Sequence, residues 1–273
     1  MPAKRFGGAT VVLTGVGREG QVGEAIAAAF AAEGAALVLL DRNQAAVEAR
    51  AATLVATGAK ATAVACDLSD VDQVTRAAAQ IAAASPASGD RPAGRIDALV
   101  HIAGGFAMSG PIGESDPAVF DRMLQANLMT AYSASRAFVP LVRDGGAVVY
   151  FASASVLPNT PAALMSGYLA AKYAVVGLMR SVAAEGHARH LRANAVAPIA
   201  VRTGDNLRDM APNTRYVERE AVADAVVFLC SSAARAVTGQ ILPLTDCSAT
   251  PLPAAIPGTS GSTGRSSYCH SSG

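Results

Sequence analysis

Tyr168 and Lys172 are four positions apart in the segment GYLAAK, and Ser155 lies thirteen residues before Tyr168. On a helix this spacing places the phenol and the ammonium on one face. A free tyrosine has a pKa of about 10, and a nearby cation lowers the cost of forming its phenolate. A serine hydroxyl directed at the same point could hold a carbonyl or alcohol oxygen. The trio therefore indicates general acid–base chemistry on a ketone–alcohol pair.

The same spacing also has a purely structural interpretation. An ordinary helix can place one tyrosine in the core and one lysine in solvent, and the bare Tyr-x-x-x-Lys pattern arises by chance in roughly one chain in fifteen of this composition. The motif therefore gains its weight from the elements that surround it.

The bulk composition favours a protein with a large core and no nucleic-acid partner. The chain has 273 residues, of which 51% are hydrophobic and 16% charged, and its net charge is +1 without a basic block. Such a charge does not provide a phosphate-neutralising surface. No apolar run approaches the roughly 20 residues that cross a bilayer, and no apolar segment follows the basic residues at the start. We expect a cytoplasmic protein without a membrane partner.

The four cysteines, Cys66, Cys230, Cys247 and Cys269, are scattered along the chain. This spacing favours reduced thiols over a disulfide framework or a zinc site, and no metal is expected. The Cys269–His270 pair is interpreted as incidental.

Short apolar runs alternate with longer alanine-rich stretches, which is typical of a parallel sheet covered by helices. Val11, Val12 and Leu13 are consecutive apolar residues, as in a strand that is buried on both faces. The expected strands are 9–14, 36–41, 61–67, 96–102, 147–152, 192–197 and 240–244. The expected helices are 22–33, 44–56, 71–84, 117–142, 166–188 and 220–231. Ser69 or Asp70 could cap the third helix, and Asp116–Pro117 is a typical start for the fourth.

The chain is expected to form one domain, over residues 1–248. Residues 85–94 have the composition of a surface loop far from any chemistry. Residues 249–273 are rich in Ser, Thr, Gly and Pro, and we expect them to form a disordered tail.

A glycine-rich turn, residues 14–23, follows the first strand and opens the first helix. Glycines let backbone amides approach a pyrophosphate at a helix N-terminus, so this turn predicts a dinucleotide site. Asp41 ends the second strand, where a carboxylate can bind both ribose hydroxyls and repel a 2′-phosphate. NAD is therefore favoured over NADP, although Arg18 or Arg42 could bind that phosphate. Asp41 could also be an ordinary strand-end or helix-capping residue.

From about residue 9 to residue 246, the ordered set of motifs resembles the short-chain dehydrogenase/reductase family, in its single-domain branch of about 250 residues. The family's glycine motif resembles residues 14–23, and its aspartate after the third strand corresponds to Asp67. Its Asn-Asn-Ala-Gly segment corresponds to residues 101–104, and its Pro-Gly-x-x-x-Thr loop to residues 198–203. The resemblance implies an α/β fold of the Rossmann type, doubly wound, with a mainly parallel seven-stranded sheet and helices on both faces.

The resemblance also implies the function, an NAD(P)-dependent oxidoreductase that transfers a hydride between nicotinamide and a carbonyl or secondary alcohol. Tyr168 would be the general acid in reduction and the general base in oxidation. Lys172 would lower the pKa of Tyr168 and hold the nicotinamide ribose. Ser155 would orient the substrate oxygen, and Asn127 would hold a water. The cofactor-binding residues that it implies are Gly15, Gly17, Gly20, Val22, Gly23, Asp41, Arg42, Asp67, Leu68, Ala103, Gly104, Tyr168, Lys172, Pro198 and Thr203. As an isolated residue, Asp67 could equally cap a turn.

Three departures from the family pattern keep other interpretations open. The glycine turn is two residues longer than usual, with Gln21 at the position of its middle glycine. His101 and Ile102 replace the two asparagines, and Ile199 replaces a glycine beside the nicotinamide. A nucleotide-binding regulatory protein without turnover is the main alternative, and a non-redox use of the same site is a third.

The expected substrate is a small, apolar molecule. Residues 105–113, 156–166 and 204–217 should surround it, and they carry several large apolar side chains. These side chains could instead simply pack the loops. The helices at 117–142 and 166–188 resemble those with which the family forms dimers and tetramers, so we expect a homodimer or a homotetramer.

Overall fold

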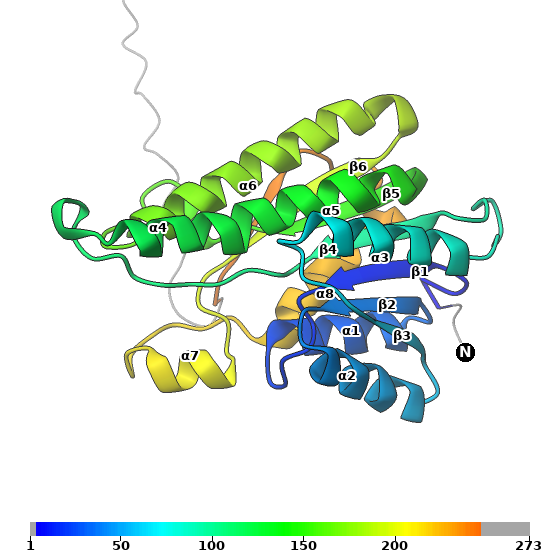
Figure 1. The fold of residues 1–273 in the computed structure, drawn as a ribbon, viewed down its shortest axis with the longest axis horizontal. Coiled ribbons are helices and arrows are strands. Elements are labelled where there is room, and N and C mark those ends of the chain that lie inside the picture. The colour runs from blue at the N-terminus through cyan, green and yellow to red at the C-terminus, as the bar shows by residue number, and fades with distance from the viewer. Residues whose placement is uncertain (1–3, 247–273) are drawn as a thin grey trace, which may run out of the picture.

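A computed structural model describes residues 4–246 of the chain, and seven parallel strands there form one sheet in the order β3-β2-β1-β4-β5-β6-β7 (Figure 1). The strands are β1 (Thr10–Thr14), β2 (Ala36–Asp41), β3 (Lys60–Ala65), β4 (Ile96–His101), β5 (Val142–Phe151), β6 (Arg192–Pro198) and β7 (Ile241–Leu244). The order changes direction at β1, which lies between β2 and β4, and open α/β sheets bind ligands beside such a switch point. The tail predicted for 249–273, with Cys247, Cys269 and His270, lies outside the described residues.

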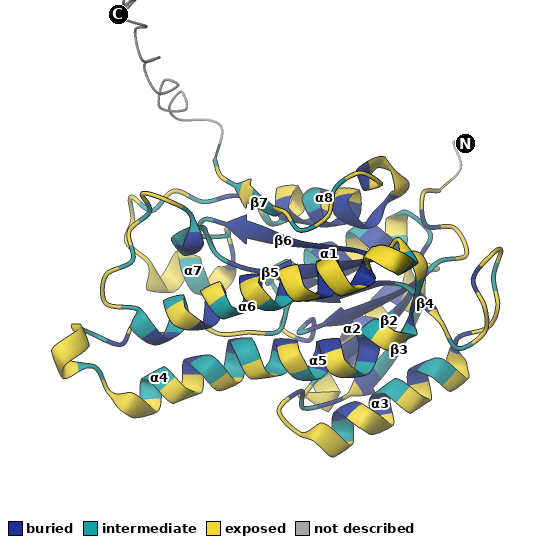
Figure 2. Ribbon diagram, turned by 90° about the horizontal axis from the view of Figure 1, so that it is seen from above, coloured by how far each residue is buried: buried dark blue, intermediate teal, exposed yellow. Residues whose placement is uncertain are grey.

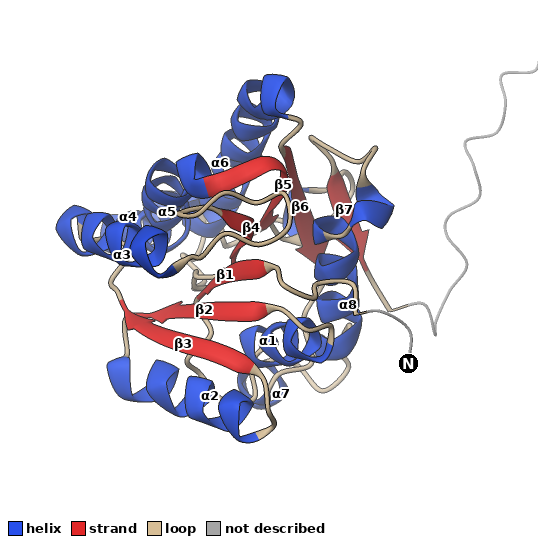
Figure 3. Cartoon of the chain, turned by 90° about the vertical axis from the view of Figure 1, so that its right-hand side faces the viewer, coloured by secondary structure: helices blue, strands red, loops and turns tan. Residues whose placement is uncertain are grey.

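Helices cover both faces of this sheet (Figure 3). They are α1 (Val22–Ala32), α2 (Gln44–Ala56), α3 (Val71–Ala84), α4 (Pro117–Met123), α5 (Thr130–Phe138), α6 (Ser166–Glu185), α7 (Gly204–Asp209) and α8 (Arg219–Cys230). The layer on one face contains α1, α2 and α8, and the layer on the other contains α3, α5 and α6. The short helix α7 lies apart from both layers (Figure 1). The doubly wound fold predicted from the sequence is confirmed.

Each face of the sheet has its own hydrophobic core. Along β1, Val11 and Leu13 pack into the core beneath α1 and α8, whereas Val12 packs into the opposite core. Successive side chains of a strand point to opposite faces, so a strand covered on both sides needs apolar residues at every position. This geometry explains the uninterrupted apolar runs in the sequence.

Several local predictions are confirmed residue by residue. Helices α2 and α3 begin and end where the sequence predicted. The Asp70 side chain caps α3 by accepting hydrogen bonds from the backbone N–H groups of Asp72 and Gln73. Asp116 caps α4 in the same way, with Pro117 at its first position.

The long helix predicted for 117–142 is wrong in its detail. It divides into α4, a π-helical segment (Leu124–Met129), α5 and a 3-10 turn (Val139–Leu141) that contains Pro140. Proline removes a backbone donor and ends the α-helix at this point. The next strand then begins at Val142, earlier than predicted, because Gly145 and Gly146 lie within β5 at a register shift opposite β4 rather than before the strand.

The loop at 85–94 is anchored rather than merely superficial. Arg91 is buried and forms an ion pair with Asp97 at 2.9 Å, and Arg143 pairs with the same carboxylate at 2.7 Å. Asp97 stands near the amino-terminal end of β4, opposite the edge where the glycine turn lies. The loop therefore stabilises the far end of the sheet.

Figure 2 shows exposed residues along the outer faces of α4, α5 and α6, while the strands behind them are buried. Within residues 4–246, the helices are all too short or too polar to cross a membrane.

Candidate active site

Four side chains predicted for catalysis come from three elements that meet at the carboxyl-terminal ends of β4 and β5. Tyr168 and Lys172 belong to the first turns of α6, and the Nζ of Lys172 lies 5.6 Å from the centroid of the Tyr168 ring. Asn127 belongs to the π-helical segment, and Ser155 to a 3-10 turn (Ala154–Val156) after β5. A Cβ on Gly104 would lie 2.6 Å from Asn127 Oδ1 and 3.6 Å from Lys172 Nζ, so this glycine lets the two side chains converge.

The Lys172 ammonium lies in the interior, with 6% of the residue exposed, and it donates a hydrogen bond to the carbonyl of Phe151 at 2.8 Å. Burial disfavours its charged form and lowers the pKa of Lys172 to about 8. The chain therefore holds a cation beneath Tyr168 that is close to releasing its proton at neutral pH.

The Tyr168 phenol has a pKa above its ordinary value, because burial disfavours the phenolate, while a hydrogen bond with Ser153 opposes this effect. Lys172 is not among the causes of this shift, so the expectation that it lowers the pKa of Tyr168 stays a prediction. At neutral pH the phenol is protonated, which is the state that donates a proton.

The hydroxyl beside Tyr168 belongs to Ser153, which the sequence analysis did not select. Ser155 lies one hydrogen bond further away, since its Oγ donates to the Oγ of Ser153 at 3.0 Å. Ser153 also caps the short 3-10 turn through the N–H of Ser155. Counting thirteen residues back from Tyr168 selected Ser155. The position two residues after the end of β5 would have selected Ser153.

Asn127 stands in the π-helical segment, a geometry that is frequent at functional sites. Its amide nitrogen donates to the carbonyls of Gly105 and Met123, each at 3.0 Å, and its Oδ1 accepts from the N–H of Gly105 at 3.2 Å. The side chain thus ties the loop after β4 to the interrupted helix. Its role in holding a water stays a prediction.

His101 is buried at the end of β4 and forms hydrogen bonds with two threonines. Its Nδ1 lies 3.0 Å from Thr14 Oγ1, and its Nε2 lies 3.5 Å from Thr130 Oγ1. The Thr14 hydroxyl accepts from the N–H of Ile102, and the Thr130 hydroxyl donates to the carbonyl of Ala126. These partners are satisfied together when Nδ1 accepts and Nε2–H donates, as in a neutral imidazole. Burial, reinforced by the charge of Lys172 and opposed by a backbone contact with Ala103, lowers the pKa of His101 to about 3.

The glycine turn has the backbone conformations that only glycine adopts easily. Gly15 and Gly20 have φ angles of +74° and +70°, and a Cβ on Gly15 would lie 2.6 Å from the backbone of Ala103. The N–H of Gly17 donates to the Asp41 carboxylate at 2.9 Å, so the turn and the end of β2 are joined directly.

Arg50 and Glu24 hold this lengthened turn, and neither was predicted. The N–H of Gly20 donates to the Glu24 carboxylate at 2.6 Å, and the buried Arg50 forms an ion pair with the same carboxylate at 2.9 Å. Arg50 also donates to the carbonyls of Val16 and Arg18. Burial tends to raise the pKa of Glu24, but the Gly20 N–H and the Arg50 charge bring it below its ordinary value. Glu24 was detectable as an acidic residue in the first turn of α1, whereas Arg50 carries no local signal.

Comparisons with known proteins agree with this geometry. The sequence family described as Enoyl-(Acyl carrier protein) reductase matches residues 15–245. Galactitol 2-dehydrogenase (L-tagatose-forming) of Cereibacter sphaeroides is 36% identical over 253 residues, covering 87% of this chain and 94% of that protein. Levodione reductase of Leifsonia aquatica is 32% identical over 263 residues, covering 89% and 95%. A solved short-chain type dehydrogenase/reductase from Mycobacterium ulcerans has a TM-score of 0.76 at 26% identity, covering 87% of this chain and 88% of that one.

The chain belongs to the short-chain dehydrogenase/reductase family. It is an oxidoreductase that uses a nicotinamide cofactor and acts on the CH–OH or C=O group of a small molecule. The family and the enzyme class predicted from the sequence are confirmed. The relatives give no support to the alternative of a regulatory protein without turnover.

The residues of this short-chain dehydrogenase/reductase fit a dinucleotide at the glycine turn. Gln21 immediately precedes α1, and its side chain does not hydrogen-bond to the first backbone N–H groups of the helix. The side chain therefore leaves these N–H groups available to an anion. Asp41 presents its carboxylate at the end of β2, beside the turn. Val22 is the first residue of α1, and Gly23 packs against Gly15 and Val16, where a Cβ would lie 2.8 Å from the Gly15 carbonyl.

The remaining predicted cofactor residues occupy several different places. Asp67 accepts hydrogen bonds from the N–H and the hydroxyl of Ser69, so it caps its own turn, and Arg42 is exposed near it. Leu68 is buried, and Pro198 ends β6. Thr203 is buried and caps α7 by accepting from the N–H of Asn206.

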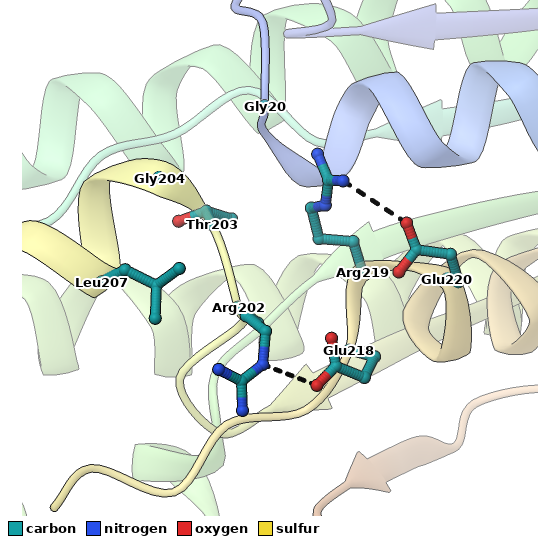
Figure 4. Close-up of a pocket in the computed structure, with 8 residues that line it drawn as sticks. All are labelled: Gly20, Arg202, Thr203, Gly204, Leu207, Glu218, Arg219 and Glu220. Atoms are coloured by element: carbon teal, nitrogen blue, oxygen red, sulfur yellow. Dashed lines mark hydrogen bonds and ion pairs between the residues drawn. The ribbon is translucent and has the colours of Figure 1, made fainter.

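A pocket of about 330 Å³ opens between the glycine turn and α7 of the enzyme (Figure 4). Gly20 forms one wall, and Thr203, Gly204 and Leu207 form another. Arg202 and Arg219 also line it, but each guanidinium already pairs with a glutamate, Glu218 or Glu220. Tyr168 is not among the lining residues. Within residues 4–246, no cluster of three or more His, Cys, Asp or Glu side chains is arranged to hold a metal ion.

Proposed function

We propose that Tyr168 is the general acid and base of a reversible ketone–alcohol interconversion in this enzyme. The observation that carries the proposal is the partly buried Tyr168 phenol, which has a hydroxyl beside its oxygen and an ammonium 5.6 Å from its ring. A group in this setting can pass one proton to or from a substrate oxygen.

In the reducing direction the chain's own residues handle the proton. A nicotinamide cofactor held at the glycine turn would supply the hydride that the carbonyl carbon accepts. Tyr168, protonated because burial raises its pKa, donates its hydrogen to the carbonyl oxygen, and the alcohol forms. Lys172 stands beneath the phenol and stabilises the phenolate left behind. In the oxidising direction the same phenolate accepts the proton of the alcohol.

We assign the contact with the substrate oxygen to Ser153, with Ser155 as its support. The hydrogen bond between Ser153 and Tyr168 favours this order, as does the donation from Ser155 Oγ to Ser153 Oγ. With its proton free to turn outward, Ser153 can stabilise negative charge on the substrate oxygen. Removal of such a donor costs about 10²–10³ in kcat, so Ser153→Ala should lose that much and Ser155→Ala considerably less. Equal losses in the two variants would contradict this order.

We propose NAD as the cofactor rather than NADP. The Asp41 carboxylate beside Gly17 would accept hydrogen bonds from ribose hydroxyls and would repel a 2′-phosphate. Arg18, one of the two arginines that could favour NADP, is already paired with Asp205. Titration of nicotinamide fluorescence should give tighter binding of NADH than of NADPH, and Asp41→Ala should remove the preference. A wild-type preference for NADPH would overturn the proposal.

We further propose a small, apolar substrate, a cytoplasmic location and one domain over 1–248. We also propose a homodimer or homotetramer that is assembled through the outer faces of α4, α5 and α6. Exposed aromatic side chains on two of these helices, Tyr132 and Tyr173, support an interface there.

The decisive experiment removes only the phenol oxygen of Tyr168. Tyr168→Phe should lower kcat about 10³-fold on a panel of ketones and secondary alcohols while NADH binding stays within about twofold. Tyr173→Phe, an exposed tyrosine on the same helix, is the matched control and should keep full activity. Near-wild-type turnover by Tyr168→Phe would refute the assignment.

A further inference from the structure

Phe106 lies directly against the catalytic tyrosine. Its ring centroid is 4.9 Å from that of Tyr168, at an interplanar angle of 88°, which is an edge-to-face contact. Phe106 nevertheless remains 56% exposed. Much of this aromatic side chain is therefore open to solvent immediately beside the proton donor.

The loop that carries Phe106 is fixed to the start of α6. Leu164, just before that helix, has a φ of +64°, an unfavourable conformation for a bulky side chain. Its carbonyl accepts from the N–H of Ser109 at 2.7 Å and from the N–H of Gly110 at 3.2 Å. Ser109 Oγ also lies 3.0 Å from Ser166 Oγ and accepts from the N–H of Ser166. The strain is thus offset by a set of bonds that hold the Phe106 loop and the Tyr168 helix together.

The surface that these two loops present is apolar and uncharged. Residues 102–113 and 152–171 contain no Asp, Glu, Lys, Arg or His. Besides Phe106, Met108 is 49% exposed and Leu164 is 46% exposed, so these side chains do not simply pack the loops.

The hydroxyls on the same loops are largely engaged. Ser109 and Ser166 bond to each other, and Thr160 donates to the carbonyl of Leu157 at 2.6 Å. The third segment near the site, 204–217, does carry charges: Asp205 there is paired with Arg18 and Arg208, and Arg215 is exposed. The two loops themselves offer a charged substrate no partner beside Phe106, and a polyol would leave most of its hydroxyls without one. An apolar ring would instead remove exposed carbon surface from water.

We propose, resting on the function proposed above, that the substrate is an uncharged alicyclic or aryl ketone, or the corresponding secondary alcohol, and that Phe106 determines this specificity. The ring of the substrate packs on the open part of the Phe106 ring while its oxygen meets Tyr168 and Ser153. The enzyme accordingly differs in substrate class from its polyol relative, the galactitol 2-dehydrogenase.

The test compares ring and polyol alcohols on the full chain with NAD. Cyclohexanol and 1-phenylethanol should show kcat/KM values at least about 10²-fold above those of galactitol and threitol. Phe106→Ala should lower kcat/KM for the ring alcohols about tenfold, through KM, and should leave 2-propanol within about threefold. Val55→Ala, an exposed apolar residue on α2 and outside these loops, is the matched control and should change neither. A preference for the polyols would overturn the proposal, as would equal losses on 2-propanol and cyclohexanol in Phe106→Ala.

A binding measurement separates this inference from the proposed reaction. Cyclohexanone is titrated into the NADH complex of the Tyr168→Phe variant, which the proposed mechanism leaves without turnover, with and without Phe106→Ala, and its dissociation constant is read from nicotinamide fluorescence. Binding that weakens about tenfold in Phe106→Ala supports the ring site even when the wild-type enzyme shows no turnover, and in that case only the proposed reaction fails. Turnover of polyols without cyclohexanone binding overturns the ring site and leaves the reaction intact. Absence of both overturns the ring site as well.

Discussion

The two sides of the active site are built with different chemistry. On the cofactor side, the glycine turn is held by charged groups: Asp41 binds the N–H of Gly17, and the Glu24–Arg50 pair binds the N–H of Gly20 and two carbonyls. On the substrate side, the Phe106 loop is held by serine hydroxyls and backbone groups.

This difference follows from what each side has to bind. A pyrophosphate needs backbone amides in fixed, unusual conformations, and an ion pair with a buried arginine can hold them because its partners are oriented by several hydrogen bonds. An uncharged substrate needs the opposite, since a charge near Phe106 would have to be desolvated whenever the substrate enters. The serine hydroxyls and backbone groups that hold the Phe106 loop are uncharged, so they place no charge there that would have to be desolvated.

The largest effect on this comparison should come from Arg50→Met. Removing the buried Arg50 takes the main counterion from the partly exposed Glu24 and the donors from the carbonyls of Val16 and Arg18, so the free energy of unfolding should fall by about 3 kcal/mol. The dissociation constant for NADH should rise because the turn loosens, while kcat at saturating NADH should change little. Urea denaturation and fluorescence titration measure the two effects.

Arg76→Met, at an exposed position on α3, is the control. Unchanged NADH affinity in a destabilised Arg50→Met would mean that the pair supports the fold alone.

An intermediate effect is expected from His101, which joins the two sides through Thr14 and Thr130. Its pKa is about 3 in the folded chain against about 6.5 when unfolded. Below pH 6.5 the unfolded chain takes up a proton that the folded chain does not, so stability falls as the pH falls. Between pH 8 and pH 5 this loss is about 2 kcal/mol, and His101→Asn should remove it.

Urea denaturation of both proteins at the two pH values measures the difference and cancels the titration of other groups. A wild-type and a His101→Asn protein that lose stability in parallel would show that the imidazole is not held neutral.

The smallest effect is expected on the substrate side, from Ser109→Ala. This change removes a neutral hydroxyl that joins Ser166 to the Phe106 loop, and such bonds contribute about 1 kcal/mol each. The free energy of unfolding should fall by about that amount, and KM for ring alcohols should rise while NADH affinity is unchanged. Thr75→Ala, on the exposed side of α3, serves as the control. A change in NADH affinity as large as that in KM would mean that the two sides are not independent.

Most of the fold could be predicted from patterns of residues that are neighbours in the sequence. Val11, Val12 and Leu13 predict a strand covered on both faces, and Asp70 predicts a helix start, because both depend on neighbours in sequence. The helix predicted for 117–142 was too simple, since a π-helical turn and Pro140 interrupt it. The same reasoning found Tyr168 and Lys172, because their spacing places them on one face of a helix. It could not find Arg50, because this residue reaches the glycine turn from the second helix.

By itself, the sequence determined the α/β alternation, the glycine turn, and the pairing of Tyr168 with Lys172, because periodicity and spacing along a chain act over a few residues. Only the tertiary structure decided that Ser153 stands at the phenol, that burial raises the pKa of Tyr168 and lowers that of Lys172, and that Phe106 covers the tyrosine. Each of these depends on how much water the other elements exclude, and desolvation is a property of the whole fold rather than of any segment.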